Sequence, residues 1–575
     1  MNNREIAETF ETVADMLAIR GDQIHRIIAY RRAAENIREL NRDLNAIMAE
    51  GNLTSIPGIG ATLAEKIEEM LTNNRLAFYD RLAEQIPPKL VEMLKVEGLG
   101  PKRVKQIYDS LGITDLDQLS KAAQEGGLRQ LPGMGAKSEA RIIAGVEALV
   151  RHGDSRTPLG VAWPVANLIV EQLRDLAGVE RVDVAGSLRR MRESIGDIDI
   201  LVAADDAEPI MEFFCAMENV ETVLGRGPTK SSVNLINGLQ VDLRVLPAAR
   251  WGTSLSYFTG SKSHNVRLRE LAIKQGLSLN EYSFTPQDGQ ADILCATEEA
   301  VYETLGLPYI PPPMREDKGE IEAALKGELP NLVQMEDIRS DLHMHSTWSD
   351  GKMTIKEMAE AASRRGLSHI VIADHSASLG IANGLTIERL RDQAAEIRAL
   401  DREFGPNFRI LHGTEMEIRA NGELDFPDEI LAALDFVIAS LHVGLRQPRE
   451  QIMERLLGAV NNPHVDMIAH PTGRLIPDRP GADVEMEVLI QRAADTGTIL
   501  EVNANPQRLD LQAKDVRRAI EIGAKLAINT DAHHADHFQF IHFGVATAQR
   551  GWATAEDVVN TWSADKLMAF VENKS

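Results

Sequence analysis

The second half of the sequence alternates between short apolar runs and amphipathic helical stretches, and this alternation limits the possible folds more than any other feature. From about residue 336 onward the apolar runs read HIVIADH, FVIASLH, VDMIAHP, TILEVNA and LAINTDAH. Strands that are buried on both faces read as continuous apolar runs, and repeated β-α units build parallel sheets and barrels. The alternation therefore predicts a β/α barrel over residues 336–575.

Histidines and acids stand at the ends of these apolar runs. The segment DLHMHSTWSDG places His343 and His345 two residues apart, so both imidazoles face the same way, and Asp350 follows in the loop. Six more residues of ligand type end later runs: His375, Glu415, His442, His470, Asp531 and His533. A single histidine is more often a packed or surface residue, but the ordered set predicts a metal centre. Mixed imidazole and carboxylate ligands suit Mn, Zn or Fe better than Mg alone.

The bulk composition indicates a multidomain protein of a reducing compartment. A chain of 575 residues with 44% apolar content exceeds what one core usually holds. Its two cysteines argue against a disulfide framework and favour the cytoplasm. Neither a signal peptide nor an uninterrupted apolar run of about 18 residues is present in the sequence. We therefore expect no membrane association, and we expect a monomer.

The net charge of -24 is unusual for a protein that binds nucleic acid, because phosphate contacts normally need Lys and Arg. The acidic excess is smallest in the first 150 residues and larger in the parts whose carboxylates are candidate metal ligands. Net charge therefore neither establishes nor excludes DNA binding.

A repeated Gly-x-Gly motif occurs three times in the first 150 residues. The copies are SIPGIGATLAEKI, KVEGLGPKRVKQI and QLPGMGAKSEARI, and their glycines are Gly58 and Gly60, Gly98 and Gly100, and Gly133 and Gly135. Glycines permit a tight turn, and the amides at the following helix N-terminus can hold an anion without any lysine. Ordinary helix-to-helix turns explain any one copy, but three copies resemble helix-hairpin-helix motifs. That resemblance implies contact with the DNA backbone without sequence preference.

Two aspartates in the segment AGSLRRMRESIGDIDILV form a second candidate metal site. Asp197 and Asp199 are two residues apart on an expected strand, which aims both carboxylates at one face, and Asp242 lies in another β-branched run, QVDLRVL. Three carboxylates from two strands suit hard divalent cations that grip a nucleotide's phosphates. The turn at Gly186 and Ser187 adds phosphate donors upstream. The alternative is an edge strand with surface acids.

The pattern changes along the chain indicate where domains begin and end. Residues 1–155 have helical spacing, whereas strands and helices alternate over about 160–250, with RVDVAGS, IDILVAA and LQVDLRV as the clearest strands. Three consecutive prolines from Pro311 forbid a regular helix or a central strand. A further domain follows them.

Residues 1 to about 317 resemble a family X DNA polymerase of the polymerase beta type. The resemblance rests on the Gly-Ser turn with Arg190, on Gly196 with the three aspartates, and on the segment YFTGSKSHN. It implies Mg²⁺ or Mn²⁺ on Asp197, Asp199 and Asp242, with a nucleotide bound by Gly186, Ser187, Arg190, Gly196, Tyr257, Phe258, Gly260 and Asn265. Lys262, after TGS, and Gln240 depart from residues common in relatives, so nucleotide affinity and primer activation can differ in degree.

The resemblance extends to a deoxyribose-phosphate lyase domain at the N-terminus. Lys66 matches the lysine that forms a Schiff base there, and His25 and Tyr30 match positions that contact DNA. An amine can form a Schiff base only if its pKa is depressed toward neutrality. Arg26 and Phe78 stand where relatives carry DNA-contacting lysines. An ordinary lysine on a helix surface is therefore an equal alternative, and binding of a DNA 5′-phosphate is the safer expectation.

The histidine-rich half resembles the polymerase and histidinol phosphatase (PHP) domain, a distorted seven-stranded barrel with three metals. The resemblance implies three ligand sets, namely His343, His345, Glu415 and Asp531; Glu415, His442 and His470; and Asp350, His375 and His533. It implies a metal-dependent 3′–5′ exonuclease, with related activity on 3′-phosphates or abasic sites. Arg419 and Arg474 can bind substrate phosphate, but we expect ordinary surface arginines.

These observations predict a fold in several domains and a DNA repair enzyme of the bacterial cytoplasm and nucleoid. The expected domains are a helical lyase-like domain (1–85), a helix-hairpin-helix domain (86–155), an α+β palm (156–247), a thumb (248–317), a linker (318–335) and a (β/α)7 barrel (336–575). The expected partners are gapped or primed duplex DNA and deoxynucleoside triphosphates. Two alternatives remain open, namely a small-molecule phosphatase with an accessory nucleotide-binding region and a non-catalytic DNA scaffold.

Overall fold

The chain forms two compact units, Met1–Ser155 and Arg156–Ser575. The computed structural model describes residues 1, 3–38, 40, 42–96, 98–152 and 156–574. None of the described helices combines the length and the apolar content needed to cross a bilayer. Each unit has hydrophobic cores of its own.

The first unit is helical, as expected. Its helices are α1 (Asn3–Arg20), α2 (Ile24–Arg38), α3 (Leu44–Ala49), α4 (Ala61–Asn73), α5 (Ala77–Ala83), α6 (Pro101–Leu111), α7 (Leu116–Gln124) and α8 (Ala136–His152), with 3₁₀ segments η1 (Leu53–Ser55), η2 (Pro88–Lys95) and η3 (Leu128–Gln130). Helix α1 buries Ile6, Phe10, Val13 and Leu17. These positions recur at the helical period, so one apolar stripe faces the core.

The second unit begins with a five-stranded α+β layer that contains the candidate aspartates. The strand order is β2 (Arg181–Val184), β4 (Ile198–Ala203), β7 (Gln240–Leu246), β6 (Lys230–Leu235) and β5 (Val220–Arg226). Only β4 and β7 run parallel. The helices of this layer are α9 (Leu159–Arg174), α10 (Gly186–Arg189) and α11 (Glu208–Cys215), and β1 (Thr157–Pro158) pairs with β3 (Ser194–Ile195). The three expected strands are β2, β4 and β7.

A smaller set of elements follows the sheet. It comprises η4 (Ala248–Arg250), α12 (Trp251–Thr259), α13 (Lys262–Lys274), the hairpin of β8 (Leu277–Leu279) and β9 (Phe284–Pro286), α14 (Glu298–Thr304), η5 (Pro312–Met314) and α15 (Glu320–Lys326). The prolines from Pro311 form only a 3₁₀ turn. Arg315, buried in this region, donates to Glu298 at 2.5 Å and places a cation beside Tyr302.

The remaining residues form the expected barrel, which confirms that prediction. Seven parallel strands follow chain order: β10 (Ser340–Met344), β11 (His369–Ile372), β12 (Arg409–Glu417), β13 (Phe436–Ser440), β14 (Met467–Ile468), β15 (Ile499–Asn503) and β16 (Leu526–Asn529). A bridge between Met344 and Ala532 joins the ends of the first and last strands. Closure therefore rests on a short contact rather than on a full ladder.

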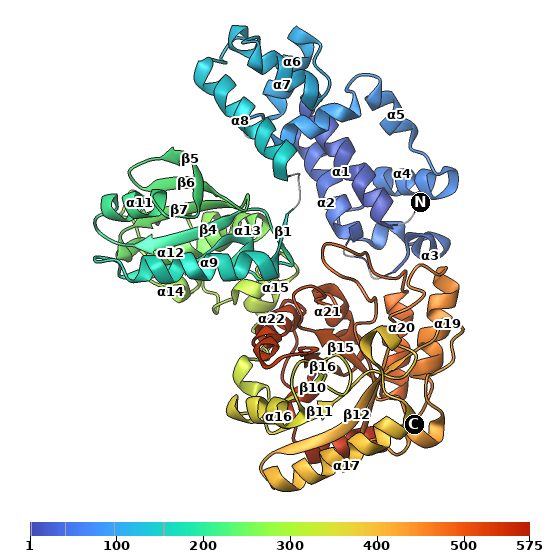
Figure 1. Cartoon of the computed structure of the whole chain (residues 1–575). Helices are drawn as coiled ribbons and strands as arrows, with labels where there is room; N and C mark the ends of the chain where they lie inside the picture. Colours follow the sequence, from blue (N-terminus) through green and yellow to red (C-terminus); the bar gives the residue numbers. More distant parts are fainter. Residues whose placement is uncertain (2, 39, 41, 97, 153–155, 575) are drawn as a thin grey trace. The chain divides into compact units, whose positions relative to one another are not determined.

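Helices surround the barrel strands (Figure 1). They are α16 (Ile355–Arg364), α17 (Ile387–Phe404), α18 (Asp428–Leu431), α19 (Arg449–Val460), α20 (Met486–Thr496), α21 (Ala513–Ile522), α22 (Ile541–Arg550) and α23 (Ala564–Glu572), with 3₁₀ segments η6 (Met335–Asp337), η7 (Gly380–Ala382), η8 (Ala535–Phe540) and η9 (Val559–Thr561). Leu567 and Val571 of α23 pack with strand residues such as Leu342, Phe436 and Ile499. This apolar cluster leaves the carboxyl ends of the strands for polar residues.

The sheet layer and the barrel share a hydrophobic core. Leu509, Phe543 and Ala546 of the barrel are buried in the same cluster as Leu159 and Ile195 of the sheet layer. The backbones also approach closely, since a Cβ atom on Gly160 would lie 2.5 Å from Cβ of Pro506. The two parts are therefore packed as one unit.

Candidate metal and nucleotide sites

The three candidate aspartates lie at the same end of two neighbouring strands. Asp199 of β4 is the register partner of Asp242 on β7, and Asp197 directly precedes β4. Lys230, on the other side of β7, places its Nζ 2.5 Å from Asp242 Oδ2, and Gln240 donates to Asp242 Oδ1 at 3.0 Å. The three carboxylates are not among the described groups of ligand atoms that all lie within 4.8 Å of one another.

Asp199 and Asp242 have pKa values that are shifted in opposite directions, because only Asp242 accepts strong hydrogen bonds from its neighbours. Burial and the charges of Asp197 and Asp242 raise the pKa of Asp199 to about 7. Burial also raises the pKa of Asp242, but hydrogen bonds from Lys230 and Gln240 outweigh it and leave that pKa below its ordinary value. The Asp199 charge is therefore the one without a strong protein partner, which favours a cation at this position.

The Gly-Ser turn lies directly against Asp199. Gly186 has a φ of +62°, and a Cβ atom there would lie 2.4 Å from Asp199 Oδ2. Only glycine combines this backbone conformation with the close approach. Ser187 follows in α10, and Arg190 ends that short helix.

Arg190 connects the turn to the YFTGS segment. Its Nη1 donates to the carbonyl of Thr259, and its Nε donates to Glu316 Oε1 at 3.0 Å. A Cβ atom on Gly260 would lie 3.2 Å from Arg190 Nη1, so these two predicted residues are neighbours.

Of the remaining predicted nucleotide residues, Tyr257, Phe258 and Asn265 lie on α12 and α13, and Gly196 lies before β4. Asn265 donates to the carbonyl of Tyr257 at 2.7 Å. The guanidinium of Arg244 stacks on Phe258 at 4.2 Å from the ring centre. Gly196 lies just before β4, where a Cβ atom would meet Arg156 Nη1 at 3.2 Å.

Glu415 is the centre of the barrel cluster. Its Oε1 lies 2.9 Å from His470 Nε2 and 3.3 Å from His442 Nε2. Its Oε2 lies 2.9 Å from His375 Nδ1, 3.3 Å from His343 Nε2 and 3.5 Å from His345 Nε2. Burial raises the pKa of Glu415, but the charges of the surrounding histidines outweigh it and hold that pKa well below its ordinary value.

Two aspartates complete the cluster at its edges. Asp531 Oδ1 lies 3.2 Å from His345 Nε2, and Asp350 Oδ1 lies 3.4 Å from His533 Nε2. Burial and the positive charges of His533 and His375 lower the pKa of His345 to about 3. His345 is therefore neutral near pH 7, which is the form of imidazole that binds a metal.

The described ligand atoms form three groups that fit a metal ion. These groups are His345, Asp350, His375 and His533; His343, His345 and Glu415; and His375, Glu415 and His442. Buried atoms of the cluster, including His343 Nε2, His345 Nε2 and Glu415 Oε2, have no hydrogen-bond partner among the described residues. Buried polar atoms of this kind are costly unless a ligand satisfies them, so the cluster is suited to metal binding. His470 and Asp531 contact the cluster without belonging to a group.

Two further acids hold the histidines, and the sequence analysis did not identify them. Glu501 Oε1 lies 2.7 Å from His343 Nδ1, and its Oε2 accepts the backbone N–H of His470 at 2.8 Å. Glu417 Oε2 lies 2.8 Å from His442 Nδ1. Carboxylates at the second nitrogen of a histidine fix the ring's tautomer and orientation. The signal in the sequence that could have identified Glu501 is its position as a charged residue inside the apolar run TILEVNA.

The expectation that Arg474 is a surface residue is wrong. Arg474 is buried and donates to both carboxylate oxygens of Glu193 in the sheet layer, at 3.0 and 2.8 Å. The backbone carbonyls of Arg508 and Leu509 also accept hydrogen bonds from the Arg474 guanidinium. Arg419 is exposed and pairs with Asp425 at 2.6 Å.

The three Gly-x-Gly hairpins have the same local structure. The first glycines, Gly58, Gly98 and Gly133, have φ values of +76°, +85° and +74°. In each copy a buried apolar residue donates its backbone N–H to the carbonyl three residues earlier, from Ile59, Leu99 and Met134. Helices α4, α6 and α8 begin directly after Gly60, Gly100 and Gly135, which are exposed. Their first-turn amides can therefore receive an anion.

The predicted lyase residues surround Phe78. Lys66 Nζ and Arg26 Cζ lie 5.0 and 4.9 Å from the centre of that ring, and Tyr30 stacks on it at 6.1 Å. Burial raises the pKa of Tyr30 to about 12. His25 is exposed on α2.

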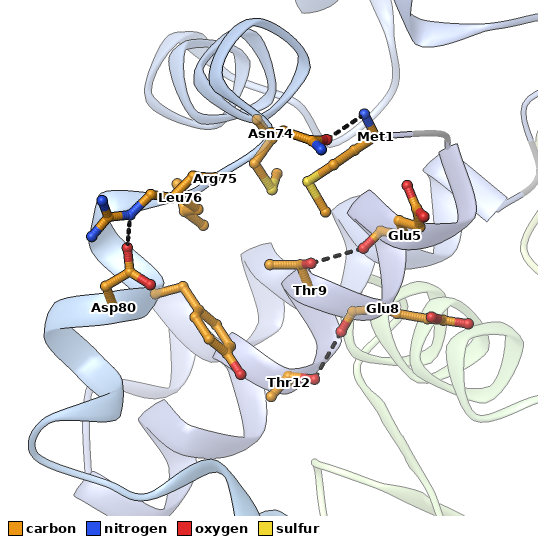
Figure 2. Close-up of a pocket in the computed structure, with 11 residues that line it drawn as sticks. Met1, Glu5, Glu8, Thr9, Thr12, Asn74, Arg75, Leu76 and Asp80 are labelled. Atoms are coloured by element: carbon orange, nitrogen blue, oxygen red, sulfur yellow. Dashed lines mark hydrogen bonds and ion pairs between the residues drawn. The ribbon is translucent and has the colours of Figure 1, made fainter.

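A cavity of about 560 Å³ in the first unit lies between α1 and the segment that joins α4 to α5 (Figure 2). Glu5, Glu8 and Asp80 line it, and Arg75 pairs with Asp80. The three acids outnumber the cations Arg75 and the N-terminal amine of Met1, so the lining does not favour a DNA phosphate.

Four families match parts of the chain. Residues 1–76 match a helix-hairpin-helix domain, and residues 90–148 match a SAM-like helix-hairpin-helix tandem. Residues 254–316 match the DNA polymerase beta thumb, and residues 341–505 match the PHP domain. These matches confirm the predicted fold classes of the helical, thumb and barrel parts.

Whole-chain similarity points to one type of protein. The chain is 39% identical over 577 residues to DNA polymerase/3′-5′ exonuclease PolX of Bacillus subtilis (strain 168), with 100% of both chains covered. The barrel part alone resembles probable phosphatases. One, from Thermoanaerobacter sp. (strain X514), is 28% identical over 41% of this chain and 94% of its own length, and one from Caldanaerobacter subterraneus subsp. tengcongensis is 29% identical over 41% and 91%. The full-length match, the hairpins, the thumb and the barrel together show that this chain belongs to the bacterial PolX family of family X DNA polymerases that carry a C-terminal PHP domain.

Proposed function

We propose that this chain is a template-directed repair polymerase that fills short gaps in DNA and shortens 3′ ends with a second, separate centre. The observation that carries the proposal is the presence of two distinct ligand clusters in one chain that matches a DNA polymerase/3′-5′ exonuclease over its full length. The partners are gapped or primed duplex DNA and deoxynucleoside triphosphates. We place the enzyme in the bacterial cytoplasm with the nucleoid, as a monomer.

In the nucleotide-adding centre, Asp197 and Asp199 would hold two divalent ions, and Asp242 would help to hold the catalytic one. Mg²⁺ or Mn²⁺ suits these oxygen ligands. Bound ions lower the pKa of the primer 3′-hydroxyl and neutralise the triphosphate. Ser187 and Arg190 bind the β- and γ-phosphates, while Tyr257, Phe258, Gly260 and Asn265 line the sugar and base. Gly186 allows its turn to lie directly against Asp199. Together with Gly196, it sets the path of the backbone between the phosphate-binding residues and the three aspartates.

In the nuclease centre, the nine barrel residues hold up to three Mn, Zn or Fe ions. The ligand sets are those that the PHP resemblance implies, with Glu415 shared between two of them. Ions held by these residues would supply Lewis-acid activation of water for hydrolysis of a phosphodiester. Glu501 and Glu417 orient His343 and His442, as their contacts indicate. Activity on 3′-phosphates and abasic sites belongs to the same centre.

The helical unit grips DNA through the six hairpin glycines, and His25 and Tyr30 help bind a 5′-phosphate. Lys66, whose ammonium lies over the ring of Phe78 beside Arg26, is the amine that would form the Schiff base of a lyase reaction. Borohydride trapping of a 5′-deoxyribose-phosphate substrate would detect the Schiff base.

The proposal also includes the division of the chain into six segments, namely 1–85, 86–155, 156–247, 248–317, 318–335 and 336–575.

A 5′-labelled duplex with a one-nucleotide gap tests both activities in one gel, with and without nucleotides, in Mg²⁺ and then in Mn²⁺. Asp199→Ala is expected to abolish extension and keep shortening, and His343→Ala is expected to do the reverse. Incorporation by the Asp199→Ala variant at the wild-type rate would contradict the assignment of the nucleotide-adding centre.

A small-molecule phosphatase is the second candidate, because the barrel part resembles probable phosphatases over most of their length. Hydrolysis of a small phosphomonoester would then exceed hydrolysis of a 3′-ended oligonucleotide. A non-catalytic scaffold would bind metal at neither centre.

A further inference from the structure

Arg550, the last residue of α22 in the barrel, reaches the nucleotide side of the sheet layer. Its Nη1 donates to the backbone carbonyl of Arg190 at 2.8 Å and to Glu316 Oε1 at 3.1 Å. Arg190 donates to the same carboxylate oxygen from its Nε, at 3.0 Å. Arg550 therefore contacts Arg190 twice, through its carbonyl and through a shared acid.

The shared acid is surrounded by cations. Arg192 Nη1 lies 3.7 Å from Glu316 Oε2, so three guanidinium groups surround one carboxylate. The side chains of Arg550, Arg190 and Glu316 are only 11%, 12% and 14% exposed. Burial raises the pKa of Glu316, but the three arginines outweigh it and lower that pKa to about 2. Glu316 is therefore ionised, and its single negative charge interacts with three guanidinium groups.

This division matters for a residue that must also bind phosphate. A carboxylate that pairs fully with one arginine holds it through two parallel hydrogen bonds. Because Arg550 also donates to Glu316, Arg190 makes a single hydrogen bond to that carboxylate, from its Nε. The Nη1 of Arg190 donates instead to the carbonyl of Thr259, beside Gly260. The bond from Arg550 to the Arg190 carbonyl also fixes the end of α10, which carries Ser187.

We propose that Arg550 of the barrel is a positioning residue for nucleotide addition, which keeps Arg190 available to the triphosphate by sharing Glu316 with it. The inference rests on the proposed role of Arg190 in binding the β- and γ-phosphates. It makes the barrel part of the nucleotide-binding scaffold, independently of any hydrolysis in its own metal centre.

The test measures KM and kcat for a single deoxynucleoside triphosphate on a one-nucleotide-gapped duplex. Arg550→Met is expected to raise KM for the nucleotide about tenfold, the size of one lost charge-assisted hydrogen bond, with a smaller effect on kcat and on DNA affinity. Arg550→Lys keeps a cation and is expected to recover most of this loss. Adding Glu316→Gln to Arg550→Met removes the competing charge and is expected to lower KM again, which a purely structural defect would not do.

Arg474→Met is the matched control. It removes a second barrel arginine that pairs with an acid of the sheet layer, Glu193, but does not contact Arg190 in the described contacts. Its nucleotide KM is expected to equal that of the wild type. Nuclease activity on the same DNA without nucleotides reports that each variant has folded.

Two results would overturn the inference: a wild-type nucleotide KM in Arg550→Met, or an equal rise in Arg474→Met. Asp199→Ala is measured in parallel. If it retains nucleotide addition, the proposed function itself fails, whereas if it is inactive and Arg550→Met has a wild-type KM, only the role of Arg550 fails.

Discussion

At the scale of single residues, the two centres solve opposite electrostatic problems. Burial and the neighbouring acids disfavour the charge of Asp199 and raise its pKa to about 7. Glu415 lies among five histidines, and the charges of His442, His375 and His343 outweigh its burial and favour its ionised form. A cation would relieve the first site, whereas the second offers an ionised carboxylate and imidazoles, of which His345 is neutral near pH 7, as ligands. Each difference leads to a prediction.

Asp199→Asn is expected to stabilise the metal-free protein, and more so at pH 8 than at pH 5. The ordinary pKa of the group is 3.8, and in the folded chain it is about 7. Below pH 3.8 the carboxyl group is protonated in both the folded and the unfolded state. As pH rises from 3.8 to about 7, the group ionises in the unfolded chain but stays protonated in the folded chain, so the folded state loses stability progressively. An amide avoids this loss.

Thermal unfolding in excess chelator at both pH values measures the effect. Asp205→Asn, at an exposed position of the same layer, is the matched control and should change the Tm at neither pH. A gain of the same size at pH 5 and pH 8 would contradict the assignment of the shift to Asp199.

Glu501→Gln is expected to lower the affinity of the barrel for metal by about 10–100-fold. The substitution removes the carboxylate beside His343 Nδ1, which fixes the tautomer and orientation of that ring. Nuclease activity at limiting Mn²⁺ should fall in proportion, and excess Mn²⁺ should restore part of it. Gap filling by the same variant serves as the internal control. Unchanged metal content after dialysis would show that Glu501 does not support the ligands.

At the scale of elements, the hairpins and the strand ends are where the sequence was most informative. Strands β11, β13, β15 and β16 and the residues that follow them were predictable, because continuous apolar runs and turn residues are local signals. Glu501 was missed because its partner His343 lies 158 residues away. Lys230 was missed and Arg474 was wrongly expected at the surface, since spacing along one segment does not show which side chain of another element a residue meets. Ligand types were thus predictable, and their supports were not.

Gly133→Ala is expected to weaken binding of duplex DNA without changing KM for the nucleotide. Its φ of +74° is required for the hairpin before α8, and a Cβ atom there meets nothing within 4 Å, so the change acts through the backbone. Gly112→Ala, at the end of α6 with a φ of +65° and equally open surroundings, imposes comparable strain outside the hairpins.

Binding of a fluorescent gapped duplex at fixed salt compares the two variants. The Kd of Gly133→Ala should rise by several-fold, whereas that of Gly112→Ala should remain near the wild-type value. Equal losses in both would assign the effect to stability of the helical unit rather than to the hairpin.

At the scale of the whole molecule, the division into units does not follow the division into activities. The sheet layer and the barrel share a hydrophobic core, and the barrel's Arg474 and Arg550 pair with Glu193 of the sheet layer and with Glu316 of the thumb part. Calorimetry is therefore expected to show the sheet layer, thumb and barrel unfolding in one transition and residues 1–155 in another. Arg474→Met should lower only the transition of the larger unit, and a separate transition for the barrel would contradict this view.

The sharing of ligands in the barrel has a consequence for any measurement of its metal content. His345, His375 and Glu415 each belong to two of the three ligand groups. An ion that binds at one group changes the position and charge of a ligand that the next ion needs, so the ions cannot load as independent equilibria. A dissociation constant obtained by titration then describes the occupied cluster as a whole, and a protein stripped of one ion is a different receptor for the others.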